Sequence, residues 1–106
     1  ALADAALQAG SRVPIHCTAS GKLLLAYLSP VKRRRLLQSL KLEKFTANTI
    51  TSIDILEAEL QGIRKAGLSI NREEYHQGLV GVAVPVLRAD GQAAAALADA
   101  TRRSSE

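Results

Sequence analysis

Residues 12–26 read RVPIHCTASGKLLLA, and the rest of the chain is organised around this stretch. Val13 and Ile15 alternate with polar or constrained residues, a period-two pattern that predicts a half-buried strand. Small residues follow at 18–21, and leucines then recur at helical spacing. The pattern predicts a strand that stops at a small-residue turn and a helix that opens near Gly21, with Thr18 or Ser20 as its N-cap.

The start of this helix is a candidate anion site. Small side chains at Ala19, Ser20 and Gly21 let a ligand approach the backbone. The unpaired N–H groups of a first helical turn and the positive end of the helix dipole favour a negative group there. We therefore expect the polar end of a ligand to bind here.

Composition indicates one soluble domain. The chain has 106 residues, a net charge of +4, 47% hydrophobic and 23% charged residues, and a single cysteine. One cysteine excludes an internal disulfide and suits a reducing cytoplasm. No apolar run has the length of a membrane span, and nothing resembles a signal peptide. We expect a domain over residues 1–100 and a polar tail over 101–106.

The second predicted helix covers residues 30–40, with Ser29 as N-cap and Pro30 at the first helical position. Val31, Leu36, Leu37 and Leu40 form its expected apolar face. The basic run 32–35 covers most of the circumference, so we expect it to be largely solvated. A contact patch for a partner or for DNA is the alternative.

The remaining elements follow from spacing and turn residues. Thr51 and Asp54 match a capping box at the start of the longest helix, whose buried face carries Leu56, Leu60 and Ile63 and which ends at Gly67. A short strand is predicted at 68–71 and a polar turn at 72–78. The apolar run 79–87 predicts a strand covered on both faces, with Pro85 where only one side can be hydrogen-bonded. A hairpin at 89–92 leads to a returning strand at 93–98.

Catalytic and metal motifs are weak in this sequence. His16 and Cys17 are adjacent, so on a strand they point to opposite faces and cannot form a nucleophile–base pair with each other. Cys17 reads as a small buried hydrophobe. The histidines, the cysteine and the carboxylates show no metal-ligand spacing. We expect no enzyme activity, no metal and no cofactor.

Four ordered segments carry a resemblance to a known family. They are residues 10–22 (GSRVPIHCTASGK), 45–51 (FTANTIT), 56–67 with its end IRKAG, and 73–86 (EEYHQGLVGVAVPV). Together they resemble the C-terminal effector-binding domain of the IclR family of bacterial transcriptional regulators, over about residues 8–100. The resemblance implies an α+β, GAF-like fold with a curved, mostly antiparallel sheet flanked by helices. It also implies a strand over residues 1–9, where helix propensity is high.

The resemblance further implies an effector pocket between the start of the first helix and the C-terminal strands. The backbone of Ala19 and Ser20 is expected to hold the polar end of the effector, Gly21 is expected to belong to the same site, and Leu2, Val13 and Leu79 are expected to line its apolar side. Members that bind small keto acids carry an acid, a cysteine and two serines at positions that match Asn71, Gly81, Ala98 and Ala100 here. This departure predicts an organic acid larger and more apolar than glyoxylate, although side chains of a tightly packed sheet can fill the same space.

By resemblance, the domain senses a metabolite and controls a winged helix-turn-helix domain that is absent from this sequence, so that contact with DNA is indirect. A homodimer or homotetramer is expected, and so is a shortened domain that lacks its first strand and closing helix. Two alternatives stay open: a ligand-free oligomerisation module, and a nucleic-acid-binding module that uses residues 32–35 with Arg102 and Arg103. A weak charge excess and few aromatic residues count against the latter.

Overall fold

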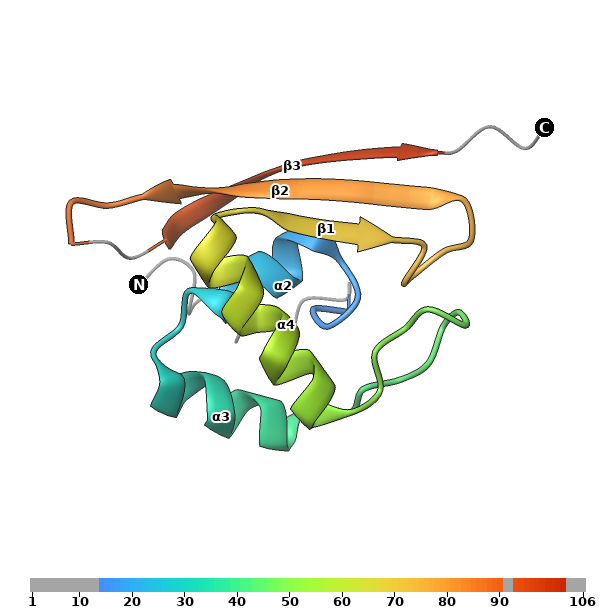
Figure 1. Ribbon diagram of the computed structural model, residues 1–106, viewed down its shortest axis with the longest axis horizontal. Helices are drawn as coiled ribbons and strands as arrows, with labels where there is room; N and C mark the ends of the chain where they lie inside the picture. Colours follow the sequence, from blue (N-terminus) through green and yellow to red (C-terminus); the bar gives the residue numbers. More distant parts are fainter. Residues whose placement is uncertain (1–13, 91–92, 103–106) are drawn as a thin grey trace.

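The computed structural model describes the backbone of residues 14–90 and 93–102 and the side chains of residues 14–90. Within these residues, three helices precede three strands in chain order (Figure 1). They are α2 (Ala19–Ala26), α3 (Pro30–Ser39), α4 (Ile53–Ala66), β1 (Ser69–Arg72), β2 (Leu79–Leu87) and β3 (Ala93–Arg102). The predicted α+β class is confirmed. The strand expected over residues 1–9 lies outside the described part of the chain.

The strands form an antiparallel sheet in the order β1-β2-β3. β1 pairs with residues 80–83, so Pro85 lies beyond its end and, within the described sheet, has a partner only on the β3 side, as predicted. β3 is longer than the predicted 93–98 strand. It continues through Thr101 and Arg102, the first residues of the expected tail, because these pair with Val80 and Leu79.

In the described structure, the helices lie on one side of the sheet (Figure 1). α2 contacts all three strands and α4, and the buried core joins Leu23 and Leu25 of α2 to Leu56 and Leu60 of α4 and to Ala83 of β2. A β-strand directs alternate side chains to opposite faces. β2 is therefore apolar on both faces although only one is covered by helices.

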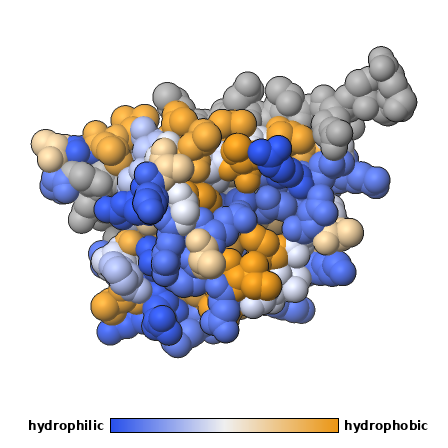
Figure 2. Space-filling view, viewed as in Figure 1, coloured by the Kyte–Doolittle hydropathy of each residue, from blue (hydrophilic) through white to orange (hydrophobic). Residues whose placement is uncertain are grey.

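The prediction that β2 is covered on both faces is wrong for the described structure. Val82, Val84 and Val86 are 38–41% exposed, whereas Gly81 and Ala83 on the other face are buried. Figure 2 shows apolar side chains gathered over the strands at the top of the view. A continuous apolar run favours burial on both faces, but it also fits a strand with an apolar outer face.

The caps of α4 correct one prediction and confirm another. Ser52, not Thr51, is the N-cap, since its hydroxyl accepts a hydrogen bond from the N–H of Ile55. Asp54 therefore sits one position too early for the predicted capping box. Gly67 ends the helix in the left-handed region, with a φ of 68°.

The buried side of α3 differs from the prediction. Val31, expected on the apolar face, is 65% exposed, while Arg33, expected in solvent, is only 7% exposed. Arg33 makes a paired contact with Glu57 of α4, from Nε to Oε1 (3.0 Å) and from Nη2 to Oε2 (2.7 Å). This ion pair holds the pKa of Glu57 below its usual range. The partner is 24 residues away in sequence, so helical periodicity does not reveal it.

Candidate functional site

The helix predicted to open near Gly21 begins at Ala19, with Thr18 as its N-cap. Thr18 Oγ1 donates to the carbonyl of Pro14 (3.1 Å) and accepts from the N–H of Gly21 (3.2 Å). The alternative cap, Ser20, is wrong because this residue lies inside the first turn. Residues 15–18 form bends and not the predicted strand, and the Thr18 hydroxyl bonds back to the Pro14 carbonyl across them. Val13 lies outside the described residues.

The capping geometry decides which N–H groups remain available. Gly21 donates to Thr18 Oγ1, and Lys22 donates to the Thr18 carbonyl (3.0 Å). No hydrogen bond within residues 14–90 uses the N–H groups of Ala19 and Ser20. Ala19 is 5% exposed and Ser20 is half-buried, so these donors lie in a partly desolvated place. They are suited to an anionic or carbonyl oxygen.

Position 21 has no space for a Cβ atom, so only glycine fits there. A Cβ atom on Gly21 would lie 2.5 Å from the Ile15 carbonyl oxygen, 2.6 Å from Ile15 Cα and 2.6 Å from Thr18 Oγ1. The bend at 15–18 thus packs directly on the helix backbone. Gly21 is needed for the turn itself, and its own N–H is engaged.

Lys22 is the centre of a buried ion network that the sequence analysis missed. Its side chain is fully buried, and Nζ donates to Glu59 Oε2, to Glu74 Oε2 (2.9 Å) and to the carbonyl of Ile70 (2.9 Å). Glu74 is also buried, and its second oxygen lies 2.9 Å from Nζ. The network joins α2 to α4 and to β1. A lone lysine in an otherwise apolar helix, with acidic pairs later in the chain, is the signal that would have indicated it.

The sheet brings the predicted strand residues together. Asn71, Gly81 and Ala100 are register partners across β1, β2 and β3, and Ala98 pairs with Ala83 in the adjacent row of the same face. Asn71, Gly81 and Ala83 are buried on the side that α2 covers. Leu79 lies on the same face of β2 and is half-buried. Leu2 and Val13 lie outside the described residues.

The turn after β1 fixes the side chain of Asn71. The backbone N–H of Glu74 donates to Asn71 Oδ1 (2.9 Å), and the N–H of Arg72 donates to Glu74 Oε2 (3.2 Å). Thr46 and Thr49, from the threonine-rich segment, hold the carbonyls of Glu73 and Glu74, each at 2.6 Å. Asn71 therefore has a fixed orientation on the inner face of the sheet.

One further polar side chain on this face, Ser69, was not among the predicted site residues. It is fully buried, two positions before Asn71 on β1, and its hydroxyl has no hydrogen-bond partner among the described residues. The alternation of polar and apolar residues in 68–71 places Ser69 and Asn71 on one face, but it favours burial of the apolar residues, so it gives no signal that these two polar side chains are buried.

His16 and Cys17 do not have the features of a catalytic pair. His16 is buried, and its Nε2 donates to the carbonyl of Glu43 (2.8 Å), which ties residue 16 to the segment before α4. Burial, with a smaller contribution from Glu74, raises the pKa of the Cys17 thiol to about 11. Among the described residues, no group of three or more His, Cys, Asp and Glu side chains is arranged to hold a metal ion.

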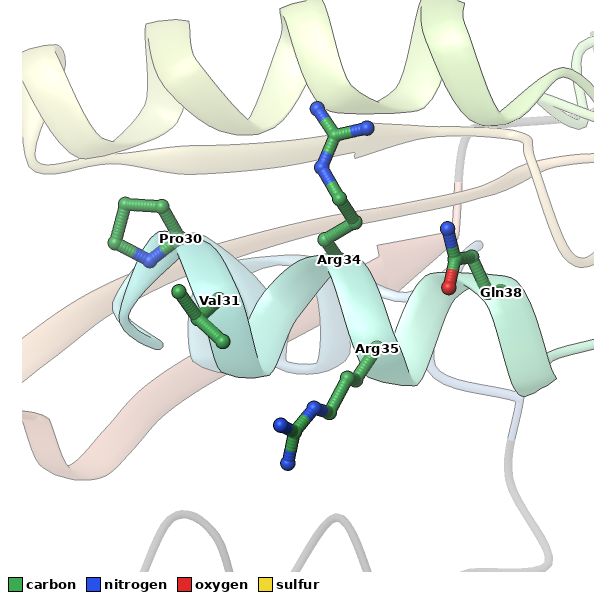
Figure 3. A pocket seen from close by; sticks show the side chains of 5 residues that line it. All are labelled: Pro30, Val31, Arg34, Arg35 and Gln38. Atoms are coloured by element: carbon green, nitrogen blue, oxygen red, sulfur yellow. The ribbon is translucent and has the colours of Figure 1, made fainter.

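A hollow of about 250 Å³ lies elsewhere, on the outer side of α3 (Figure 3). The residues that line it are Pro30, Val31, Arg34, Arg35 and Gln38. None of them is a predicted site residue. It is open and shallow, and its side chains are exposed. Because Arg33 is committed to Glu57, the basic run presents less charge to a partner than the sequence suggested. No helix in the described part of the chain is long and apolar enough to cross a bilayer.

Comparison with known proteins identifies the chain. A family model described as "Bacterial transcriptional regulator IclR C-terminal" matches residues 2–105. This chain belongs to the IclR family. It is 52% identical over 92 residues to the probable transcriptional regulator SauR of Cupriavidus necator, covering 87% of this chain and 36% of that protein.

Solved structures of IclR-family proteins agree with the fold. The PobR inducer-binding domain from Acinetobacter, a double mutant in complex with 3-hydroxybenzoic acid, matches with a TM-score of 0.81 and 32% identity, over 88% of this chain and 55% of that chain. The C-terminal domain of Escherichia coli KdgR matches with a TM-score of 0.80 and 33% identity, over 88% and 57%. This chain spans about a third of the length of the curated relatives it matches.

Proposed function

We propose that this chain is the effector-binding part of an IclR-type transcriptional regulator. A small organic acid binds between the start of α2 and the inner face of the sheet, and its binding changes the DNA affinity of a winged helix-turn-helix domain outside this chain. For such coupling, the acid must bind the two states of the regulator with different affinity.

The main support for this proposal is that the N–H groups of Ala19 and Ser20 make no hydrogen bond within residues 14–90. Thr18 uses the N–H of Gly21, so the first two donors of α2 remain for a ligand. A carboxylate at this point accepts hydrogen bonds from both and interacts favourably with the helix dipole. The burial of Ala19 strengthens these interactions because water competes less there.

The small residues of the sheet support a large, apolar acid. Gly81 and Ala83 on β2, with Ala98 and Ala100 as their register partners, form a row of residues with little or no side chain opposite α2. Ala83 packs in the buried core, so we expect the acid at the end of the row formed by Gly81 and Ala100, where the small side chains accommodate more volume than glyoxylate or pyruvate would fill. The complex of the PobR domain with 3-hydroxybenzoic acid supports an aromatic acid as the class.

A thermal-shift screen tests the proposal. The panel contains glyoxylate, pyruvate, benzoate, 3-hydroxybenzoate, 4-hydroxybenzoate and a medium-chain fatty acid. An acid at 100 times its dissociation constant adds about 2.7 kcal/mol to the free energy of unfolding, which raises the Tm by several degrees. We expect this shift with an aromatic or medium-chain acid.

A proline at position 19 tests directly whether the N–H groups of Ala19 and Ser20 bind the carboxylate. Thr18 has φ −120° and ψ 152°, a conformation that a following proline permits, and position 19 is the first helical residue. Ala19→Pro removes one donor without disturbing the helix bonds, whereas Ala19→Val adds similar volume and keeps the N–H. We expect about tenfold weaker binding for Ala19→Pro relative to Ala19→Val. Equal affinities of the two variants would contradict a role for the Ala19 N–H in binding the carboxylate. In the thermal-shift screen, a response to glyoxylate or pyruvate alone would contradict the proposal that the acid is large and apolar.

We also propose that the regulator is a homodimer or homotetramer. The exposed valines on the outer face of β2 support association through apolar surface. Analytical ultracentrifugation of the chain at several concentrations tests this directly, and a monomer throughout would contradict it.

A further inference from the structure

The Ser69 hydroxyl is a buried polar group without a partner. Ser69 is 0% exposed, and its Oγ makes no hydrogen bond within the part of the chain that the structure describes. Most buried side-chain hydroxyls in proteins are hydrogen-bonded, so an unpaired one requires an explanation. A ligand that supplies the missing partner is one such explanation.

Its place in the sheet connects Ser69 with the candidate site. Ser69 and Asn71 lie two residues apart on β1 and face the same side of the sheet. Ser69 is in register with Ala83, and Asn71 with Gly81, so both polar groups border the row of small residues. Between them, the carbonyl of Ile70 accepts a hydrogen bond from Lys22 (2.9 Å), which fixes this part of β1 against α2.

Asn71 offers a donor beside this hydroxyl. Within residues 14–90, its side chain is hydrogen-bonded only through Oδ1, which accepts from the N–H of Glu74. The Nδ2 amide group is therefore available to an oxygen acceptor, and the Ser69 hydroxyl can either donate or accept. Both groups are neutral. The Lys22 ammonium next to them is already paired with Glu59 and Glu74, so it does not offset a further charge.

We propose that Ser69, together with Asn71, binds a neutral polar substituent of the effector at the end remote from its carboxylate. The effector is then an aromatic or aliphatic monocarboxylic acid that carries a hydroxyl or carbonyl oxygen. A second ionised carboxylate is excluded, because burying it here leaves a charge without a counter-charge. This inference rests on the proposed function and makes Ser69 a specificity-determining residue.

A cycle of matched ligands and variants tests the inference. Calorimetry measures the affinities of benzoate, 3-hydroxybenzoate, 4-hydroxybenzoate and benzene-1,3-dicarboxylate for the unmodified chain, for Ser69→Ala and for Ser39→Ala. The control removes an exposed hydroxyl, which donates to the Leu36 carbonyl at the end of α3. We expect the unmodified chain and the control to bind one hydroxybenzoate about tenfold more tightly than benzoate, and the dicarboxylate least.

Ser69→Ala is expected to lose this preference. Its affinity for the hydroxybenzoate falls about tenfold, and its affinity for benzoate stays within about twofold. Without ligand, the variant melts at the same or a higher temperature, because the substitution removes an unpaired buried hydroxyl. A variant that folds and keeps the original ratio of affinities overturns the role of Ser69 and leaves the proposed function intact. If no acid in the panel binds the unmodified chain, the proposed function itself fails, and this inference with it.

Discussion

At the scale of single residues, Gly21 is more closely packed than Gly62, Gly67 or Gly78. Gly21→Ala places a methyl group within 2.6 Å of the Ile15 backbone, and backbone atoms cannot move aside as a flexible side chain would. We expect a loss of about 3 kcal/mol in the free energy of unfolding, measured by urea denaturation. Gly62→Ala is the control, because nothing lies within 4 Å of its added methyl. It should stabilise α4 by about 0.5–1 kcal/mol, and equal effects at the two positions would contradict this account.

The Cys17 thiol should make stability depend on alkaline pH. Burial raises its pKa from 9.0 to about 11, so the folded chain keeps a proton that the unfolded chain loses between these values. The free energy of unfolding therefore falls as pH rises from 9 towards 11. Denaturation at several pH values should give a shallower decline for Cys17→Ala than for the unmodified chain. Parallel curves would show that the thiol does not contribute.

Among the elements, α2 depends on the Lys22 network for its attachment to α4 and β1. Lys22→Met leaves Glu74 buried without its counter-charge and should cost about 3–5 kcal/mol. The double variant Lys22→Met with Glu74→Gln should recover part of this loss, because it removes the unpaired charge. Glu59→Gln should have a smaller effect, since that side chain is 37% exposed. Denaturation midpoints of the unmodified chain, Lys22→Met, Glu74→Gln and the double variant measure the coupling, and strict additivity of the two single variants would contradict it.

The secondary-structure elements also show which parts of the fold could be predicted from the sequence. Caps and apolar spacing are local, so α2–α4 and β1–β3 were predicted to within a few residues, whereas the strand expected before Gly21 is replaced by bends. Contacts distant in sequence were not: Arg33 is buried by Glu57, and Lys22 by Glu59 and Glu74. For the candidate site, the row of Asn71, Gly81 and Ala100 was anticipated only through the family resemblance, because register is a property of paired strands. The orphan hydroxyl of Ser69 emerged only from the packed structure.

For the whole molecule, the layering predicts opposite responses at adjacent positions of β2. Ala83 is fully buried against the helices, whereas Val84 is 38% exposed on the outer face. Ala83→Leu should overpack the core and cost about 1–3 kcal/mol. Val84→Thr should change stability by only about 0.5 kcal/mol or less, because threonine is also suited to strands. Comparable losses at both positions, by thermal or urea unfolding, would show that the outer face is covered in solution.

The buried lysine also has a consequence for the order of folding. The strands are joined by successive hairpins, but Lys22 lies 37 residues from Glu59 and 52 from Glu74, so a long stretch of chain must close before these contacts form. We expect the network to be absent from the folding transition state. Stopped-flow kinetics should then show that Lys22→Met accelerates unfolding and hardly slows folding. The candidate site would accordingly be the last part of the domain to assemble and the first to open.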